Sequence, residues 1–212
     1  MSEIQNAIPL KIIMVGAMNV GKTSLVTRYM TGKCPNQPKT TKNASYVNKY
    51  IKKDGYTFEV KLWDTAGQEK YKSLTKIFTK DTKIAILVYS IDSKESFNEL
   101  DNWLKLVKEA NQEDLILGVA ANKSDLASDN TISPQEGQLY AQKIGAIWKS
   151  TSAITENGGI EEFIDILFNK YFENNFSMNP PTSQSLTISM EDTKESGPCC
   201  IGGQKSIGYK RK

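Results

Sequence analysis

A glycine-rich segment near the start of the chain has the residue types and spacing of a phosphate-binding loop. Residues 16–23 read G-A-M-N-V-G-K-T, follow an apolar run and precede a helical pattern, which is the context that G-x-x-x-x-G-K-[ST] requires. Gly16 and Gly21 allow a sharp turn and a close approach to phosphate, and the helix N-terminus offers N–H groups. The residues expected to bind phosphate are Asn19, Val20, Gly21, Lys22, Thr23 and Ser24.

Two side chains of this loop carry specific chemistry. Lys22 places a cation against the β- and γ-phosphates, which also makes it a candidate catalytic residue, and the Thr23 hydroxyl can join the octahedral shell of Mg²⁺. Alone, the loop predicts only binding of a nucleoside triphosphate, and it fits a kinase, an ATPase or a GTPase equally.

The segment N-K-S-D at residues 122–125 predicts which base is bound. It follows a strand-like run at residues 115–121, and open parallel sheets bind ligands at the carboxyl ends of their strands. The Asp125 carboxylate can accept N1–H and N2–H₂ of guanine, whereas adenine leaves it unpaired, so discrimination of about 10⁴–10⁵ is attainable. A tetrapeptide of this kind standing alone would equally suit a polar turn.

Other residues complete the predicted base site. We expect the stem of Lys123 to cover the base ring and Asn122 to tie its loop to the phosphate loop. Ser152 and Ala153 follow a further strand, at residues 146–149, and should lie at the base edge. There the Ala153 N–H could reach O6 of guanine.

The elements that position these loops alternate between strand-like and helix-like segments. Strands are predicted at residues 10–15, 46–51, 57–63, 84–89, 115–121 and 146–149. The pair Asp54-Gly55 predicts a hairpin between the second and third strands. We therefore predict an α/β fold of the P-loop NTPase type, with a six-stranded, mostly parallel sheet, one antiparallel edge strand and helices on both faces.

Helix starts are indicated by capping residues. Ser133 precedes Pro134 and stands three residues before Glu136, which predicts a capping box. A further helix is predicted to begin at Asp92 or Ser93, with Glu95 completing a capping box from Asp92. The first helix is expected at residues 21–31. The last helix should bury one stripe: Ile160, Phe163, Ile164, Leu167, Phe168 and Tyr171.

The composition excludes several other classes of protein. The chain has 212 residues, 39% of them hydrophobic, and contains no histidine, so histidine-based triads and histidine-ligated zinc are ruled out. A net charge of +3 argues against nucleic-acid binding. Three cysteines form no disulfide framework, which favours a reducing compartment. The sequence shows neither a secretory signal nor an apolar run long enough to span a membrane.

Residues 63–69, W-D-T-A-G-Q-E, make the sequence resemble a known family. Together with the two motifs above, in this order, they are similar to the Ras superfamily. The tryptophan before D-T-A-G-Q-E, Ser96-Phe97 opening the third helix, and the pair Cys199-Cys200 are most similar to Rab proteins. The resemblance covers residues 10–172 and implies a GTPase that switches between GTP-bound and GDP-bound states with Mg²⁺.

The resemblance also implies roles for individual residues. Asp64 would hold Mg²⁺ through water, Gly67 would sense the γ-phosphate through its N–H, and Gln68 would orient the attacking water. Thr41, 23 residues before Asp64, would ligate Mg²⁺ and touch the γ-phosphate. Because these contacts need the γ-phosphate, its hydrolysis would release both switch loops. No arginine finger stands near the switches, so a slow intrinsic rate and a partner's arginine are expected.

Three positions depart from the family pattern. Met18 is a large residue where most relatives have a small one, beside the expected position of Gln68. Residues 41–46, T-K-N-A-S-Y, replace T-I-G-x-x-F, and Ile154 replaces the lysine of the S-A-K loop. The first two motivate an alternative function, a GTP-binding module with little hydrolysis. A P-loop phosphotransferase such as a nucleoside kinase is a further alternative, against which residues 64–68 and 122–125 argue.

Aromatic residues near the switches are candidates for partner binding. Tyr46, Trp63 and Phe78 stand where Rab relatives present an aromatic triad to effectors, and Tyr71 lies in the second switch. Ordinary packing in the sheet and helices would explain them equally well. The implied partners are effectors, an exchange factor and a GTPase-activating protein, with the chain itself a monomer.

The chain is predicted to divide into an N-terminal extension at residues 1–9, a GTPase domain at 10–175 and a hypervariable tail at 176–212. The tail is rich in Asn, Ser, Thr, Pro and Gly. Cys199 and Cys200 resemble a double-prenylation site, although twelve residues follow them, and processing, an appended terminus or an unlipidated protein all remain open. The implied location is the cytosolic face of an endomembrane.

Overall fold

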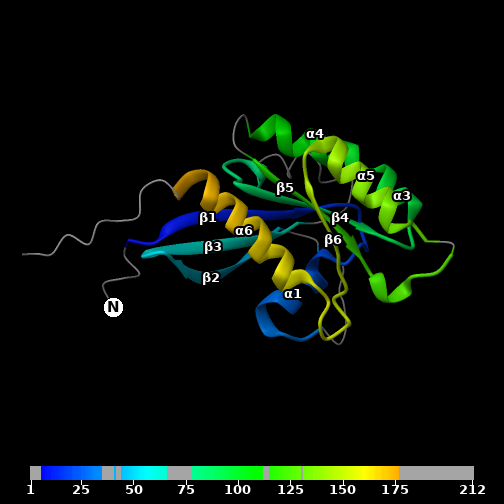
Figure 1. Cartoon of the computed structure of the whole chain (residues 1–212), viewed down its shortest axis with the longest axis horizontal. Helices are drawn as coiled ribbons and strands as arrows, with labels where there is room; N and C mark the ends of the chain where they lie inside the picture. The colour runs from blue at the N-terminus through cyan, green and yellow to red at the C-terminus, as the bar shows by residue number, and fades with distance from the viewer. Residues whose placement is uncertain are drawn as a thin grey trace, which may run out of the picture. The chain divides into compact units, whose positions relative to one another are not determined.

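The computed structural model describes residues 6–34, 41, 44–65, 78–111, 115–129 and 131–176. They all belong to the first of two units, Met1–Pro181 and Thr182–Lys212. A six-stranded sheet with the order β2-β3-β1-β4-β5-β6 forms the centre of this unit (Figure 1). Its strands are β1 Ile8–Val15, β2 Ser45–Lys53, β3 Tyr56–Asp64, β4 Ile84–Ser90, β5 Ile116–Asn122 and β6 Ile147–Ser150.

The sheet has the predicted mixture of strand directions. β1 runs parallel to β3 and β4, β4 to β5, and β5 to β6, whereas β2 pairs antiparallel with β3. Asp54 and Gly55 form the turn between β2 and β3 with φ angles of 48° and 81°, the left-handed conformations that a two-residue hairpin needs. The predicted fold class is confirmed.

This topology gathers the candidate functional loops at one edge. The five parallel strands end at Val15, Asp64, Ser90, Asn122 and Ser150. Parallel strands place their carboxyl ends together, so the loops that follow them meet at the same edge of the sheet.

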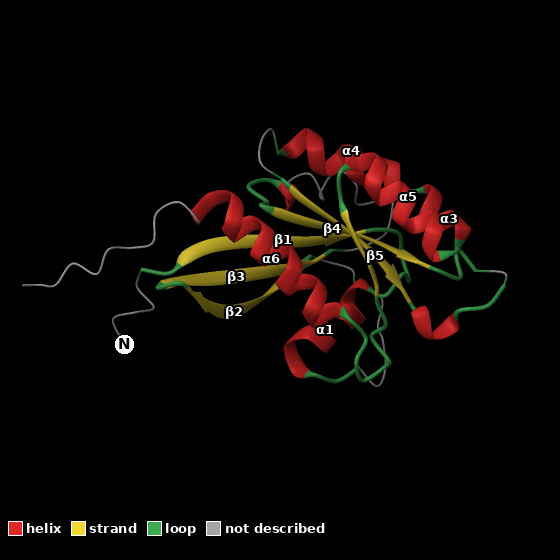
Figure 2. Ribbon diagram, viewed as in Figure 1, coloured by secondary structure: helices red, strands yellow, loops and turns green. Residues whose placement is uncertain are grey.

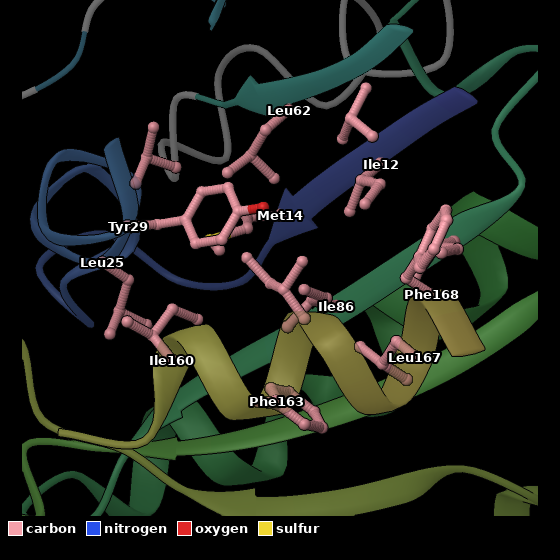
Figure 3. Close-up of a cluster of buried hydrophobic side chains, with 14 of the residues drawn as sticks. Ile12, Met14, Leu25, Tyr29, Leu62, Ile86, Ile160, Phe163, Leu167 and Phe168 are labelled. Carbon is pink, nitrogen blue, oxygen red and sulfur yellow. The ribbon is translucent and has the colours of Figure 1, made fainter. Parts of the chain in front are cut away.

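Helices cover both faces of the sheet, as the side-chain alternation of β1 requires. Leu10, Ile12 and Met14 lie in a core shared with α1 Lys22–Thr31 and α6 Ile160–Phe176, and Figure 3 shows this packing. Ile13 and Val15 lie in a second core. The helices of that face are α3 Lys94–Asn98, α4 Leu100–Ala110 and α5 Pro134–Ile144 (Figure 2).

Of the two predicted helix starts, Ser93 is confirmed, and the capping box predicted from Asp92 is wrong. Ser93 is the N-cap of α3, and its side chain accepts a hydrogen bond from the N–H of Ser96. The helical run is also interrupted at Glu99, so that α3 and α4 are separate helices. The capping box of Ser133 and Glu136 at the start of α5 is confirmed.

The secondary structure extends slightly beyond the predicted GTPase domain at both ends. β1 begins at Ile8, inside the predicted N-terminal extension, because the Ile8 side chain packs against the core. α6 reaches Phe176, the first residue of the predicted tail, whose ring lies 5.0 Å from that of Tyr56 and 5.2 Å from that of Phe58. Within the described residues, no helix combines the length and hydropathy that crossing a bilayer requires.

Candidate nucleotide-binding site

The phosphate loop takes a conformation that only glycine tolerates at two positions. Gly16 has φ +151°, and a Cβ atom there would lie 2.1 Å from the Val88 carbonyl oxygen. Gly21, the N-cap of α1, has φ +93°, and a Cβ atom would lie 2.4 Å from Nδ2 of Asn122. The N-cap residue Gly21 has no side chain that could cap α1. The N–H groups of the first turn, including those of Thr23 and Ser24, lack intrahelical partners and can meet an anion.

Lys22 is buried inside this loop. Its Nζ donates to the carbonyl oxygens of Gly16 at 2.8 Å and Ala17 at 2.7 Å, and only 5% of the residue is exposed. Burial lowers the pKa of Lys22 to about 8, and the charge of Asp64 opposes that shift. The loop thus holds a desolvated cation among its own carbonyl groups, a position where an anionic ligand would stabilise the charged form.

Asp64 reaches the phosphate loop because of its position in β3. Phe58, Val60 and Leu62 occupy the buried face of the strand, and period-two alternation puts Asp64 on that face as well. The Thr23 hydroxyl donates to Asp64 Oδ2 at 2.6 Å.

Thr41 joins the same cluster. Its Oγ1 lies 2.5 Å from that of Thr23 and 3.4 Å from Asp64 Oδ2. The structure therefore brings together the three residues predicted to surround a metal, one from α1, one from the segment before β2 and one from the end of β3.

One oxygen of this cluster has no hydrogen-bond partner among the described residues. Asp64 is 4% exposed, and its Oδ1 is buried without a hydrogen bond within the described part of the chain. Burial raises the pKa of Asp64, against the hydrogen bond from Thr23, the charge of Lys22 and the hydrogen bond from Thr41. A carboxylate with a spare buried oxygen, beside two hydroxyl groups, fits Mg²⁺, which prefers oxygen ligands and keeps several waters.

Asn122 connects the base loop to the phosphate loop. It ends β5, is 1% exposed, and donates from Nδ2 to the Val20 carbonyl oxygen at 2.7 Å. Its Oδ1 accepts from the Thr151 hydroxyl at 3.4 Å, and the Ser124 N–H donates to the Thr151 carbonyl at 3.0 Å. The predicted tie is therefore present, and it extends to a third loop after β6.

Ser152 organises that third loop around Asp125. Its hydroxyl donates to Asp125 Oδ1 at 2.5 Å and accepts from the N–H groups of Ile154 at 3.1 Å and Thr155 at 3.2 Å. The Ser152 N–H donates to the Gly158 carbonyl at 2.8 Å. Ser152 is fully buried, whereas Asp125 is exposed and accessible to a ligand.

Sequence reasoning missed several residues that shape the base site. The buried Arg28 of α1 donates from Nη2 to the Glu156 carbonyl and so joins α1 to the loop after β6. A Cβ atom at Gly158 would lie 1.7 Å from the Ser152 carbonyl oxygen, so this loop also requires glycine. The pair Gly158-Gly159 was the available signal for a tight turn. Gly67, Gln68 and Tyr71 lie outside the described residues, as do Cys199 and Cys200.

The three candidate effector aromatics lie in contact with one another. The Tyr46 and Trp63 rings are 4.8 Å apart, and those of Trp63 and Phe78 are 5.7 Å apart. Tyr46 is 49% exposed and Trp63 is half-buried. The cluster therefore both packs on the sheet and reaches the surface.

A glycine loop between β1 and α1, at the carboxyl edge of a mostly parallel sheet, defines a P-loop nucleotide-binding protein. The sequence matches the Ras family over residues 11–173. Ras-related protein Rab-21 of Homo sapiens is 34% identical over 210 residues, which cover 93% of each chain. The Bos taurus Rab-21 is 39% identical over 74% of this chain and 70% of its own, and that of Geodia cydonium 36% over 76% and 71%. The chain therefore belongs to the Ras family, as a Rab-like small GTPase that binds GTP and hydrolyses it to GDP.

Proposed function

We propose that this GTPase acts as a Mg²⁺-dependent switch that recruits effectors to an endomembrane during vesicle traffic. The observation that carries the proposal is the joining of separate loops at one edge of the sheet. Asn122 bonds to the phosphate loop at Val20, and Thr23 and Thr41 both approach Asp64. A single ligand with a base at one end and phosphates at the other would span these contacts.

In this proposal the base half selects guanine. The exposed carboxylate of Asp125 accepts N1–H and N2–H₂, the stem of Lys123 covers the ring, and the Ala153 N–H donates to O6. Ser152 holds the carboxylate in place through its 2.5 Å hydrogen bond. Adenine would leave Asp125 without donors, which is the physical basis for rejecting it.

The phosphate half binds the charged phosphates and the metal ion. N–H groups of residues 19–24 face the phosphates, and Lys22 turns from its loop carbonyls toward the β- and γ-phosphates. Thr23 and Thr41 would offer their hydroxyl oxygens to Mg²⁺, and the buried carboxylate of Asp64 would hold a water of the ion. When bound, Mg²⁺ neutralises charge on the phosphate oxygens.

Hydrolysis then depends on residues at the γ-phosphate. Gln68 orients the attacking water and the Gly67 N–H contacts the γ-phosphate. A partner's arginine supplies further charge, with an effect of about 10³–10⁵ on the rate. Loss of the γ-phosphate removes the contacts of Thr41 and Gly67, and both switch loops are released.

The proposed partners use the surface beside the switches. Effectors, an exchange factor and a GTPase-activating protein would contact Tyr46, Trp63, Tyr71 and Phe78. Two prenyl chains on Cys199 and Cys200 would give stable membrane attachment. The mass of the intact protein isolated from membranes tests this attachment, and an unmodified full-length mass would contradict it.

Single-turnover hydrolysis of bound GTP is the decisive experiment for the switch. The purified protein should carry GDP or GTP, identified by chromatography, and should release phosphate slowly in Mg²⁺. The Gln68→Leu variant should keep the nucleotide and lose the release. A parent protein that holds GTP but releases no phosphate above the uncatalysed rate would indicate a non-hydrolysing module.

The same assay tests whether Met18 slows hydrolysis. Met18 is 47% exposed in the phosphate loop, and its side chain would occupy space beside Gln68. The Met18→Gly variant should therefore hydrolyse GTP faster than the parent. Equal rates would show that Met18 does not obstruct the attacking water.

A further inference from the structure

Lys123, the second residue of the base loop, is fixed along its backbone on both sides. It has a left-handed conformation with φ 62°, which is uncommon for a residue other than glycine. The preceding carbonyl, that of Asn122, accepts from the Ile91 N–H at 3.0 Å, and the following N–H, that of Ser124, donates to Thr151 at 3.0 Å. Hydrogen bonds to two neighbouring loops thus fix the backbone at Lys123. They do not fix the direction of its long side chain.

An acidic residue from the turn after β4 sets that direction. Lys123 Nζ lies 3.6 Å from Asp92 Oδ2, and the two side chains are 32% and 38% exposed. Asp125, the nearest carboxylate along the chain, instead accepts from Ser152. Asp92 therefore holds the Lys123 ammonium group toward the β4 side of the base loop.

Asp92 is itself held in place by a buried hydroxyl. Ser90, the last residue of β4 and 1% exposed, donates from its Oγ to Asp92 Oδ1. The turn is closed by the Ser93 N–H, which donates to the Ser90 carbonyl at 3.0 Å. A chain of contacts thus runs from the core of the sheet through Ser90 and Asp92 to the head of Lys123.

We propose that Asp92 is a positioning residue for nucleotide binding, which holds the Lys123 side chain extended so that its aliphatic stem is ready to cover the purine. The proposal rests on the proposed function, because it requires Lys123 to contact the base. A free lysine side chain loses much rotamer freedom when it is ordered. If the ion pair orders the Lys123 side chain before the ligand arrives, less side-chain entropy is lost when the ligand binds.

The experiment compares nucleotide release from the parent and from Asp92→Asn, in the full chain with Mg²⁺ present. The stem of Lys123 contacts the ring face rather than the 2-amino group, so release of GDP and of inosine diphosphate should accelerate by the same factor. For a partly exposed ion pair we expect about twofold to fivefold. The acceleration should shrink at high salt, because screening already weakens the pair in the parent.

Two further variants separate positioning from a general structural effect. Glu95→Gln removes an exposed carboxylate from the first turn of the same helix but keeps the Asp92–Lys123 pair, and it should release GDP at the parent rate. In a Lys123→Met background the stem remains but the ammonium group is gone. There Asp92→Asn should have no additional effect, whereas a structural role for Asp92 would persist.

Each outcome has a defined meaning. Unchanged release from Asp92→Asn, or the same acceleration in the Lys123→Met background, would overturn the positioning role. A change confined to GDP, with inosine diphosphate unaffected, would also overturn it, because it would point to Asp125. Failure of the parent to bind either nucleotide would contradict the proposed function instead.

Discussion

The site has a base half, with Asn122, Asp125 and Ser152, and a metal half at the phosphate end, with Lys22, Thr23, Thr41 and Asp64. The two halves differ in how far contacts within the protein complete them. In the base half, Asn122, Asp125 and Ser152 all have hydrogen-bond partners within the chain. In the metal half, Asp64 Oδ1 is buried without a partner among the residues that the structure describes. Buried polar groups nearly always have partners, so the base half is formed before a ligand arrives, and the metal half needs the ligand to become complete.

The two halves also differ in how far their charged groups are buried. Burial lowers the pKa of Lys22 and raises that of Asp64, so both charged forms in the metal half are disfavoured by desolvation. Asp125, in contrast, is exposed. The comparison indicates that base selection relies on a carboxylate held in a fixed position. Phosphate and metal binding instead rely on ligands that stabilise the charged forms of buried groups.

The largest expected effect comes from removing the carboxylate of the base half. Asp125→Ala should raise the Kd for GDP by about 10²–10⁴-fold, since two hydrogen bonds to a charged group contribute about 1.5–3 kcal/mol each. Asp125→Asn should bind xanthosine diphosphate better than GDP, because its amide can donate to the added carbonyl. Titration with both nucleotides measures this. The control Asp129→Asn, an exposed acid three residues after Leu126, should behave as the parent, and a similar loss there would remove the distinction.

Removing the ion tests the metal half. With EDTA present, GDP release from the parent should accelerate by about 10–100-fold, the range typical when groups around a metal are lost. Asp64→Asn should release GDP quickly even at Mg²⁺ concentrations that slow release from the parent, since it loses the charge beside Thr23 and Thr41. Stopped-flow release measured against Mg²⁺ concentration shows this, with the exposed Asp81→Asn as the matched control. A release rate independent of Mg²⁺ would mean that the metal half is complete without the ion.

Asn122 belongs to both halves, so its loss should weaken the connection between them. Asn122→Ala leaves the Val20 carbonyl without its donor, and an unsatisfied buried group costs about 1–3 kcal/mol. We expect unfolding in urea at lower concentration and about tenfold faster GDP release. Asn98→Ala, at an exposed position of α3, provides the matched control. Unchanged stability in Asn122→Ala would show that the two halves are held together by other contacts.

The sequence allowed prediction of the sheet and of the base loop because local patterns determine them. Apolar runs marked the strands, and the strand ends then placed Asn122 and Asp125 at the correct edge. The phosphate-loop motif predicted the Thr23 hydroxyl near Mg²⁺, but its clustering with Thr41 and Asp64 could be expected only from resemblance to a family. Its contacts join residues 18 to 41 positions apart, and no local pattern encodes such pairing.

The wrong helix cap has the same origin. Asp92 and Ser93 are both good capping residues, and local chemistry does not choose between them. In the structure Asp92 contacts Ser90 and Lys123, so that Ser93 is left to cap α3. The contact of Asp92 with Lys123 joins distant parts of the chain, so the local sequence does not predict it.

The smallest predicted effect concerns the position where this chain lacks the lysine of the S-A-K loop. Ile154 is 67% exposed, and its backbone N–H donates to the Ser152 hydroxyl within the loop after β6. Ile154→Lys keeps that bond and adds a stem that can lie along the base. Because exposed substitutions usually change free energies by no more than about 0.5 kcal/mol, GDP release should slow by about twofold at most.

Comparison of Ile154→Lys with Ile154→Ala separates base packing from surface charge. The alanine variant should match the parent, since the side chain it removes is mostly in solvent. If GDP release from Ile154→Lys slowed by tenfold or more, the base half of the parent would lack an important contact with guanine at this position. The base half would then, like the metal half, not be complete before a ligand binds, and the difference between the two halves would no longer hold.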